Sequence, residues 1–236
     1  MAATLLWHDE RHGPLPTLLL ALTMLTGLVD AISYLTLGHV FVANMTGNVV
    51  FLGFAIAGAT DLSIPASLVA IGAFLGGALA GGRLASRAGD HRGRLLAIAT
   101  YIEIALVGAA LAVSLAAPRA DDDIVRYSFI VLLALSMGLQ NATARRLGVP
   151  DLTTTVLTLT LTGLAADSAL AGGKSPNPWR RIVSTVTMFL GAAIGAFLIF
   201  HFGVSAVLAL ALALLVVSGI AAYRLSSSVE TWTAGV

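Results

Sequence analysis

The 236-residue chain contains no cysteine and few charged residues. Without cysteine it has no disulfide, no thiolate metal site and no cysteine nucleophile. Charged side chains make up 11% of the residues, against about 25% in an average soluble domain. The formal net charge of +1 gives no reason to expect a nucleic-acid partner. The few charges are clustered, which leaves long uncharged stretches at 64–82, 104–118 and 182–200.

Hydrophobic residues take the place of the missing charges, at 58% of the chain. An apolar stretch of roughly 18 residues or more can cross a bilayer as a helix. The sequence therefore predicts an all-α polytopic membrane protein, with a cytoplasmic tail at 1–14, one membrane domain at 15–224 and a disordered tail at 225–236. Two apolar blocks, 41–60 and 152–173, are less regular because they contain Asn, Thr and Gly. The regular helices are expected near 15–38, 66–86, 94–116, 124–142, 180–202 and 204–224.

The positive-inside rule separates two topologies for these eight blocks. If all eight cross, the basic break at 83–94 and the later basic residues at 180–181 fall on opposite sides. If blocks 41–60 and 152–173 enter and leave on one side, every basic cluster falls on the side of both termini. The second arrangement predicts about six spans plus two re-entrant or broken segments. It places both termini in the cytoplasm.

Short motifs recur in the same order in the two halves of the chain. A single match means little in apolar sequence, but three matches in order indicate repeats of about 15–116 and 124–224. With three crossings in each half, the second copy is inverted, as in many secondary transporters. The matched stretches are 27–31 with 138–142, 55–58 with 169–172, and 74–78 with 189–193.

Two stretches in the first half, Thr26–Leu35 and Val40–Asn48, resemble the signature of the YoaK-like family. Members of this family are bacterial inner-membrane proteins built from one domain of unknown function. The second-half stretches 138–142 and 161–163 are similar to other motifs of the family, and the resemblance extends over roughly 18–223. It implies a bacterial multi-pass membrane protein and no particular substrate.

Two acidic residues fall inside predicted helices, where a charge is costly unless it is paired or hydrated. Asp30 lies about 15 residues into the first helix, with Thr26 and Tyr34 on the same face as hydrogen-bond candidates. Asp30 is interpreted either as a proton-coupling and substrate-coordinating group or as a protonated structural aspartate. Glu103, inside the predicted helix at 94–116, is a second candidate for proton coupling.

The polar residues Asn44, Thr46 and Asn48 predict a short helix that begins at mid-depth. Asn and Thr are good N-caps, and the N-terminus of a helix offers N–H groups and a positive dipole end. Such an end suits an anionic or polar neutral solute. We therefore expect these three side chains to bind substrate.

Polar residues of the second half complete the predicted site. Thr153, Thr160 and Asp167 follow one another at seven-residue spacing and are expected on one helical stripe. Their alternative role is bonding by threonine to its own helix backbone. Gln140 and Asn141 occupy the positions that Val29 and Asp30 hold in the first half; their alternative role is hydrogen bonding between helices.

These features predict a membrane transporter or channel for a small polar or anionic solute, coupled to protons through Asp30 or Glu103. The alternative is a membrane-embedded enzyme, or a structural or partner-binding membrane protein. No catalytic residue, metal ligand or cofactor is predicted, although an acid dyad of Asp30 and Asp167 would revive the enzyme. The expected partners are the lipid bilayer and a small solute or ion, without nucleic acid, and a homo-oligomer stays open.

Overall fold

The computed structural model describes residues 11–88, 91–117, 122–155, 157–173, 178–227 and 230–233. Its regular elements in these residues are all helices, which confirms the predicted class. Two short helices, α3 (Met45–Ile56) and α7 (Leu157–Ala166), accompany six that are long and apolar enough to cross a membrane. The long helices are α2 (Leu15–Thr36), α4 (Ile64–Arg87), α5 (Arg92–Ala116), α6 (Asp123–Leu147), α8 (Pro178–Phe202) and α9 (Val204–Leu225).

The outer surface of the bundle carries large apolar side chains. Leu75, Phe189 and Val217 lie on three different long helices, and each is more than half exposed. A water-soluble monomer rarely leaves so many such side chains uncovered. The bilayer is the solvent that this surface fits.

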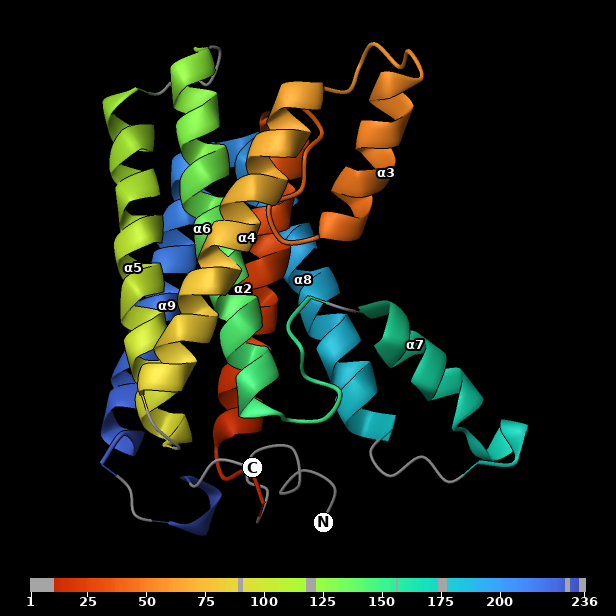
Figure 1. Ribbon diagram of the computed structural model, residues 1–236, viewed down its shortest axis with the longest axis vertical. Coiled ribbons are helices and arrows are strands. Elements are labelled where there is room, and N and C mark those ends of the chain that lie inside the picture. The colour runs from red at the N-terminus through yellow and green to blue at the C-terminus, as the bar shows by residue number, and fades with distance from the viewer. Residues whose placement is uncertain are drawn as a thin grey trace.

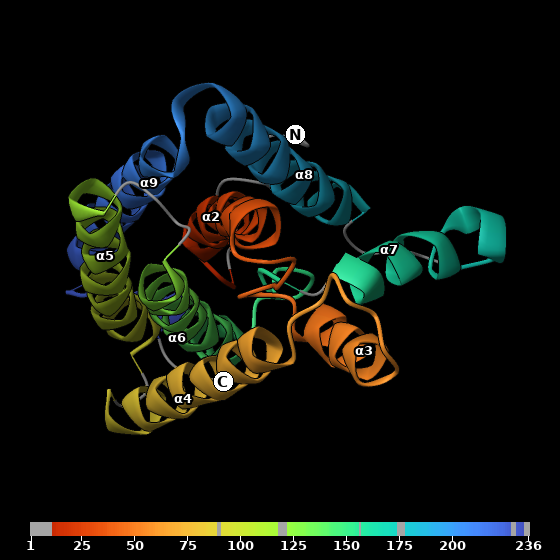
Figure 2. The ribbon, with the colours of Figure 1, turned by 90° about the horizontal axis from the view of Figure 1, so that it is seen from above.

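The path of the chain explains why two apolar blocks looked irregular. In Figure 1, α2 begins and α9 ends at the lower end of the bundle, and the six long helices alternate in direction between the two ends. Helix α3 begins near mid-height and runs to the upper end, whereas α7 begins near mid-height and runs to the lower end. Seen from above, both short helices lie along one side of the bundle, next to α4 and α8 (Figure 2). Each short segment therefore returns to the end from which it came.

Glycines let the long helices touch backbone to backbone in two matching pairs. On α2 and α8, a side chain at Gly27 would collide with the Met188 carbonyl, and one at Gly191 would collide with the Met24 carbonyl. On α6 and α4, Gly138 meets the Phe74 carbonyl and Gly77 meets the Leu135 carbonyl in the same way. The pair α2–α8 thus packs as the pair α6–α4 does. These contacts align Phe74 with Met188, one residue away from the sequence match of 74–78 with 189–193.

Part of the C-terminal tail is folded, contrary to the expectation of disorder from residue 225. Thr231–Thr233 form a 3₁₀-helix, and Trp232 is 4% exposed and packs on Gly13. The buried Arg92 side chain donates to the carbonyl oxygens of Arg11 and Trp232, at 3.4 and 3.3 Å. A bulky indole and a buried guanidinium thus hold this segment against the bundle.

Candidate functional site

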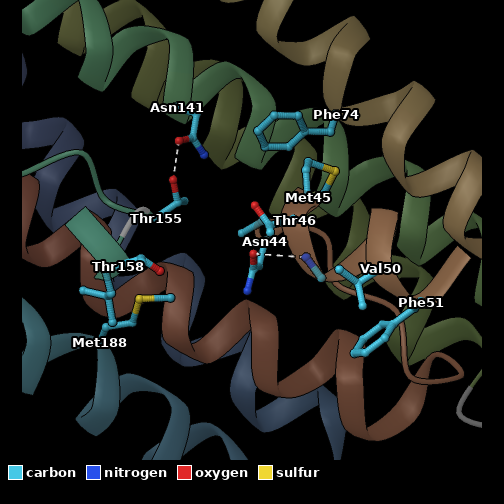
Figure 3. Close-up of a pocket in the computed structure, with 13 residues that line it drawn as sticks. Asn44, Met45, Thr46, Val50, Phe51, Phe74, Asn141, Thr155, Thr158 and Met188 are labelled. Carbon is cyan, nitrogen blue, oxygen red and sulfur yellow. Dashed lines mark hydrogen bonds between the residues drawn. The ribbon is translucent and has the colours of Figure 1, made fainter. Parts of the chain in front are cut away.

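A cavity of about 520 Å³ lies where the two short helices begin (Figure 3). This volume falls within the range of about 300–1,000 Å³ that is typical of small-molecule sites. Its described lining contains no charged side chain, and it combines amide and hydroxyl groups with apolar ones. The lining residues are Ala43, Asn44, Met45, Thr46, Gly47, Val50, Phe51, Phe74, Asn141, Thr155, Leu157, Thr158 and Met188.

Both short helices present their N-terminal ends to this cavity. Met45, the first residue of α3, and Leu157, the first residue of α7, line it. From there the two helices lead away toward opposite ends of the molecule (Figure 1). The first turn of a helix carries N–H groups without intrahelical partners and the positive end of the helix dipole. The two dipole ends therefore favour negative groups in the cavity, whose described lining contains no lysine or arginine.

Asp30 and Asn141 tie the chain segments that lead into these helices. The Asp30 carboxylate accepts a hydrogen bond from the Ala43 N–H at 3.2 Å, two residues before α3. The Asn141 side-chain carbonyl accepts one from the Thr155 hydroxyl at 2.5 Å, two residues before α7. Asn141 lines the cavity, whereas Asp30 is 8% exposed and lies behind the lining residue Ala43. Asp30 and Asn141, which occupy matching positions in the two halves, therefore each hold the segment that leads into a short helix.

The three polar residues of the segment 44–48 divide between the cavity and the loop before it. Asn44 and Thr46 line the cavity, and Asn44 caps α3 by accepting from the Gly47 N–H at 3.5 Å. Asn48 is fully buried: its amide accepts from the Phe41 N–H at 2.8 Å and donates to the Phe41 carbonyl at 2.5 Å. Asn48 therefore fixes the entering loop and does not line the cavity.

Gln140 joins two long helices and does not line the cavity. Its side-chain amide is fully buried and donates to the Thr26 hydroxyl at 2.9 Å and to the Leu22 carbonyl at 3.4 Å. The Thr26 hydroxyl also donates to Leu22, so it is not the expected partner of Asp30. Tyr34, the other expected partner, stacks on Phe41 with ring centroids 5.1 Å apart. Gln140 therefore joins α6 to α2 by hydrogen bonds.

The predicted stripe of Thr153, Thr160 and Asp167 is wrong, because α7 extends only from Leu157 to Ala166. Thr153 precedes the helix and is exposed; Thr160 is 5% exposed and outside the cavity lining. Asp167 follows the helix at the end far from the cavity.

Asp167 belongs to an ion-pair cluster around Arg181. The Arg181 guanidinium donates to Asp151 at 2.9 Å and to Asp167 at 2.8 Å, so that one arginine of α8 holds the chain on both sides of α7. The guanidinium packs on Gly163, where a side chain would collide with it. Asp167 is thus paired with Arg181 and forms no dyad with Asp30.

Glu103 lies on α5, which contributes no described residue to the cavity lining. It is 1% exposed, and its Oε2 atom has no hydrogen-bond partner among the described residues. Tyr101, two residues before Glu103, packs edge-on against Tyr223. The two candidate acids therefore differ in place: Asp30 adjoins the cavity and Glu103 does not.

Sequence reasoning did not single out Thr155, Thr158, Phe74 or Met188 as parts of the site. A signal for Thr155 was present, because the offset between Asp30 and Asn141, extended along the chain, also pairs Asn44 with Thr155. The other three become neighbours only when α4, α7 and α8 meet. In Figure 3 the Thr158 and Met188 side chains lie together on one side of the cavity, across from Phe74.

Comparison with known proteins gives a family and one relative. The model of the family described as "Protein of unknown function (DUF1275)" matches residues 18–221. The chain is similar to the UPF0700 transmembrane protein YoaK of Bacillus subtilis (strain 168), with 36% identity over 151 residues. That match covers 64% of this chain and 66% of the relative, just under two thirds of its length. No solved structure matches significantly.

Proposed function

The chain belongs to the DUF1275 family of proteins of unknown function, and from the cavity at the starts of α3 and α7 we propose that it is a transporter or channel for a small polar or anionic solute. The observation that carries the proposal is the meeting of two helix N-termini at one cavity that contains amide and hydroxyl groups. Asn44, Thr46 and Thr158 supply side-chain donors there, whereas the Thr155 hydroxyl already donates to Asn141. A bare cation would face positive dipole ends, whereas an anion or a polar neutral solute finds hydrogen-bond donors.

The correspondence of the two halves supports transport rather than a static role. We infer that α2–α5 and α6–α9 are inverted repeats, since their glycine contacts match and since Asp30 and Asn141 tie matching segments. Transporters of this plan place the substrate between the repeats near the middle of the membrane, often at broken helices. The cavity lies between α3 of one half and α7 of the other.

The short helices are loosely packed, which suits a moving gate. Within α3 only Asn48 is buried, and within α7 only Thr160. Elements with few buried apolar contacts open at low free-energy cost. We propose that access to the cavity is controlled by displacement of α3 or α7 against the rigid glycine-packed helices.

Proton coupling at Asp30 is part of the proposal. The carboxylate holds the Ala43 N–H, and Ala43 lines the cavity. Binding of a proton would weaken this charge-assisted hydrogen bond and loosen the segment that leads into α3. Glu103 stays the second candidate, because its buried carboxylate has an oxygen without a partner among the described residues.

The distribution of arginine supports cytoplasmic termini in a bacterial inner membrane. The ends of α4, α6 and α9 and the starts of α5 and α8 lie at one end of the bundle (Figure 1). They carry nearly all the described arginines, and Arg126, at the other end, is paired with Asp123 at 2.7 Å. An excess of basic residues marks the cytoplasmic side.

Solute binding by the purified chain tests the proposal. A panel of small anions and neutral polar solutes is screened for a rise in the thermal unfolding midpoint, because a bound solute stabilises the folded state by mass action. Thr158→Val, which removes a cavity hydroxyl, should weaken binding by about tenfold. Thr153→Val, the same change at an exposed site outside the cavity, should leave affinity unchanged. Failure of every solute, or equal weakening by both variants, would refute the proposed site.

A further inference from the structure

A second cleft lies at the arginine-rich end of the bundle, between the last turns of α4 and α6. Its volume is about 450 Å³. The lining consists of Gly82, Ala85 and Ser86 from α4, and Ala142, Arg145 and Arg146 from α6. Four of these residues are small, both arginines are exposed, and the described lining contains no carboxylate. The cleft is thus a hollow of small residues with two guanidinium groups beside it.

Helix packing explains why this place is hollow. Gly81 meets Ala142 and the Leu139 backbone, so α4 and α6 touch directly at that level. One residue further along α4, a side chain at Gly82 would have no atom within 4 Å. The Ser86 hydroxyl donates back to the Arg83 carbonyl at 2.8 Å and leaves the space open.

The matching helix pair at the opposite end of the bundle carries no such charge. Gly195 of α8 meets Leu28 and Ala31 of α2 as Gly81 meets Leu139 and Ala142. Three and four residues past Ala31 stand Tyr34 and Leu35, where α6 has Arg145 and Arg146 past Ala142. Packing of this helix crossing therefore does not require arginine. The two guanidinium groups are specific to the cleft on α4 and α6.

An apolar strip leads along α4 to the cleft. Leu75, Leu79, Gly82 and Ser86 follow at helical spacing and share one face. Leu75 and Leu79 are 60% and 55% exposed, on the surface that faces lipid. A molecule that lies along this face would place an apolar part on the leucines and a polar part beside the arginines.

We propose that this cleft binds the phosphate headgroup of an anionic phospholipid, with an acyl chain along Leu75 and Leu79. Arginine pairs with phosphate through two parallel hydrogen bonds. Basic pockets between membrane helices at the level of the headgroups recognise anionic lipids in this way. The lipid site goes beyond the proposed transport function and does not depend on it, because the two cavities share no lining residue.

Lipid binding is measured on the full chain in detergent, by native mass spectrometry and by the thermal unfolding midpoint. Phosphatidylglycerol is titrated as the anionic probe, with phosphatidylcholine as the zwitterionic one. Wild-type protein should retain phosphatidylglycerol in preference. The double variant Arg145→Ala/Arg146→Ala should weaken its binding roughly thirtyfold, at about fivefold for each arginine near the headgroups.

Two further variants separate a defined site from general attraction by charge. Arg94→Ala/Arg224→Ala removes two exposed arginines from the same end of the bundle but outside the cleft, and should change affinity by no more than about twofold. Gly82→Leu fills the cleft without changing charge and should displace the lipid. Since Gly82 has open space around it, this variant should fold even if loss of both cleft arginines prevents folding.

Any of the following results would overturn the proposal. The first is equal weakening by the two double arginine variants, which would mean diffuse attraction to the surface. The second is retention of phosphatidylcholine as tightly as phosphatidylglycerol, or unchanged lipid binding in Gly82→Leu. The third is stabilisation of the wild type by inorganic phosphate that displaces the lipid, which would make the cleft a site for free phosphate.

Discussion

The Asp30 side chain on α2 holds the backbone N–H of Ala43, thirteen residues further along the chain, at 3.2 Å. This hydrogen bond joins the middle of a long helix to the segment that leads into the cavity. A carboxylate is costly at this depth, yet an amide could accept the same bond. What the carboxylate adds to this hydrogen bond is a charge, which a proton can remove.

Asp30→Asn keeps an acceptor for the hydrogen bond from Ala43 but removes the group that binds a proton. Asparagine keeps an acceptor for the Ala43 N–H, so membrane insertion should be normal and stability should change by less than about 1 kcal/mol. Solute transport by reconstituted protein should lose its pH dependence. In Asp30→Leu the Ala43 N–H is left without its acceptor, which should cost about 1–3 kcal/mol in the free energy of unfolding. An unchanged pH profile in Asp30→Asn would assign Asp30 a structural role alone.

Asn48 and Thr46, two residues apart, should respond in opposite ways to removal of their polar groups. If Asn48 bound substrate, as the sequence predicts, Asn48→Leu would abolish solute binding and leave a folded protein. The structure revises that expectation: leucine would leave both backbone groups of Phe41 unpaired and should destabilise the protein by about 2–4 kcal/mol. Thr46→Val should keep stability and weaken solute binding. Thermal unfolding and solute titration of both variants distinguish the two roles; a stable Asn48→Leu protein would contradict the first.

Gly77 and Gly76 are adjacent on α4 but face different surroundings. Gly77 meets the Leu135 backbone, whereas a Cβ atom at Gly76 would lie 3.5 Å from the flexible Leu135 side chain. Gly77→Leu should therefore separate α4 from α6 and sharply reduce the amount of folded protein. Gly76→Leu, at the neighbouring position, should be tolerated, because only a flexible side chain lies near it. The amount of monodisperse protein on size-exclusion chromatography compares them; equal yields would contradict the packing role of Gly77.

Single cysteines test the topology, since the chain has none of its own. Asp61, in the turn between α3 and α4, and Asp122, at the start of α6, are exposed at the same end of the bundle. Cysteines at both sites should react from outside the cell with a thiol reagent that does not cross the membrane. A cysteine at Arg224, at the other end, should react only after the membrane is opened. Labelling of Arg224→Cys in intact cells would reverse the proposed orientation.

The sequence by itself determined the class of the protein and the number of long and short apolar segments. Transfer into a bilayer depends on the hydrophobicity of one continuous stretch, so each span can be recognised without its neighbours. The polar blocks around Asn44 and Thr155 showed as irregular for the same reason. Their composition does not suit a helix that faces lipid along its whole length.

Tertiary structure decided which polar side chains meet the cavity. Asn44 and Asn48 lie in one short motif, yet one lines the cavity and the other binds the Phe41 backbone. Spacing along the chain predicts that Asp167 belongs to the site, whereas in the structure it is paired with Arg181 of α8. A buried polar group is stabilised by whichever donor or acceptor packing brings within reach, and those partners come from segments far apart in the chain. Spacing along one helix therefore cannot identify these partners. They depend on how the helices pack, including the glycine contacts that bring α2 to α8 and α4 to α6.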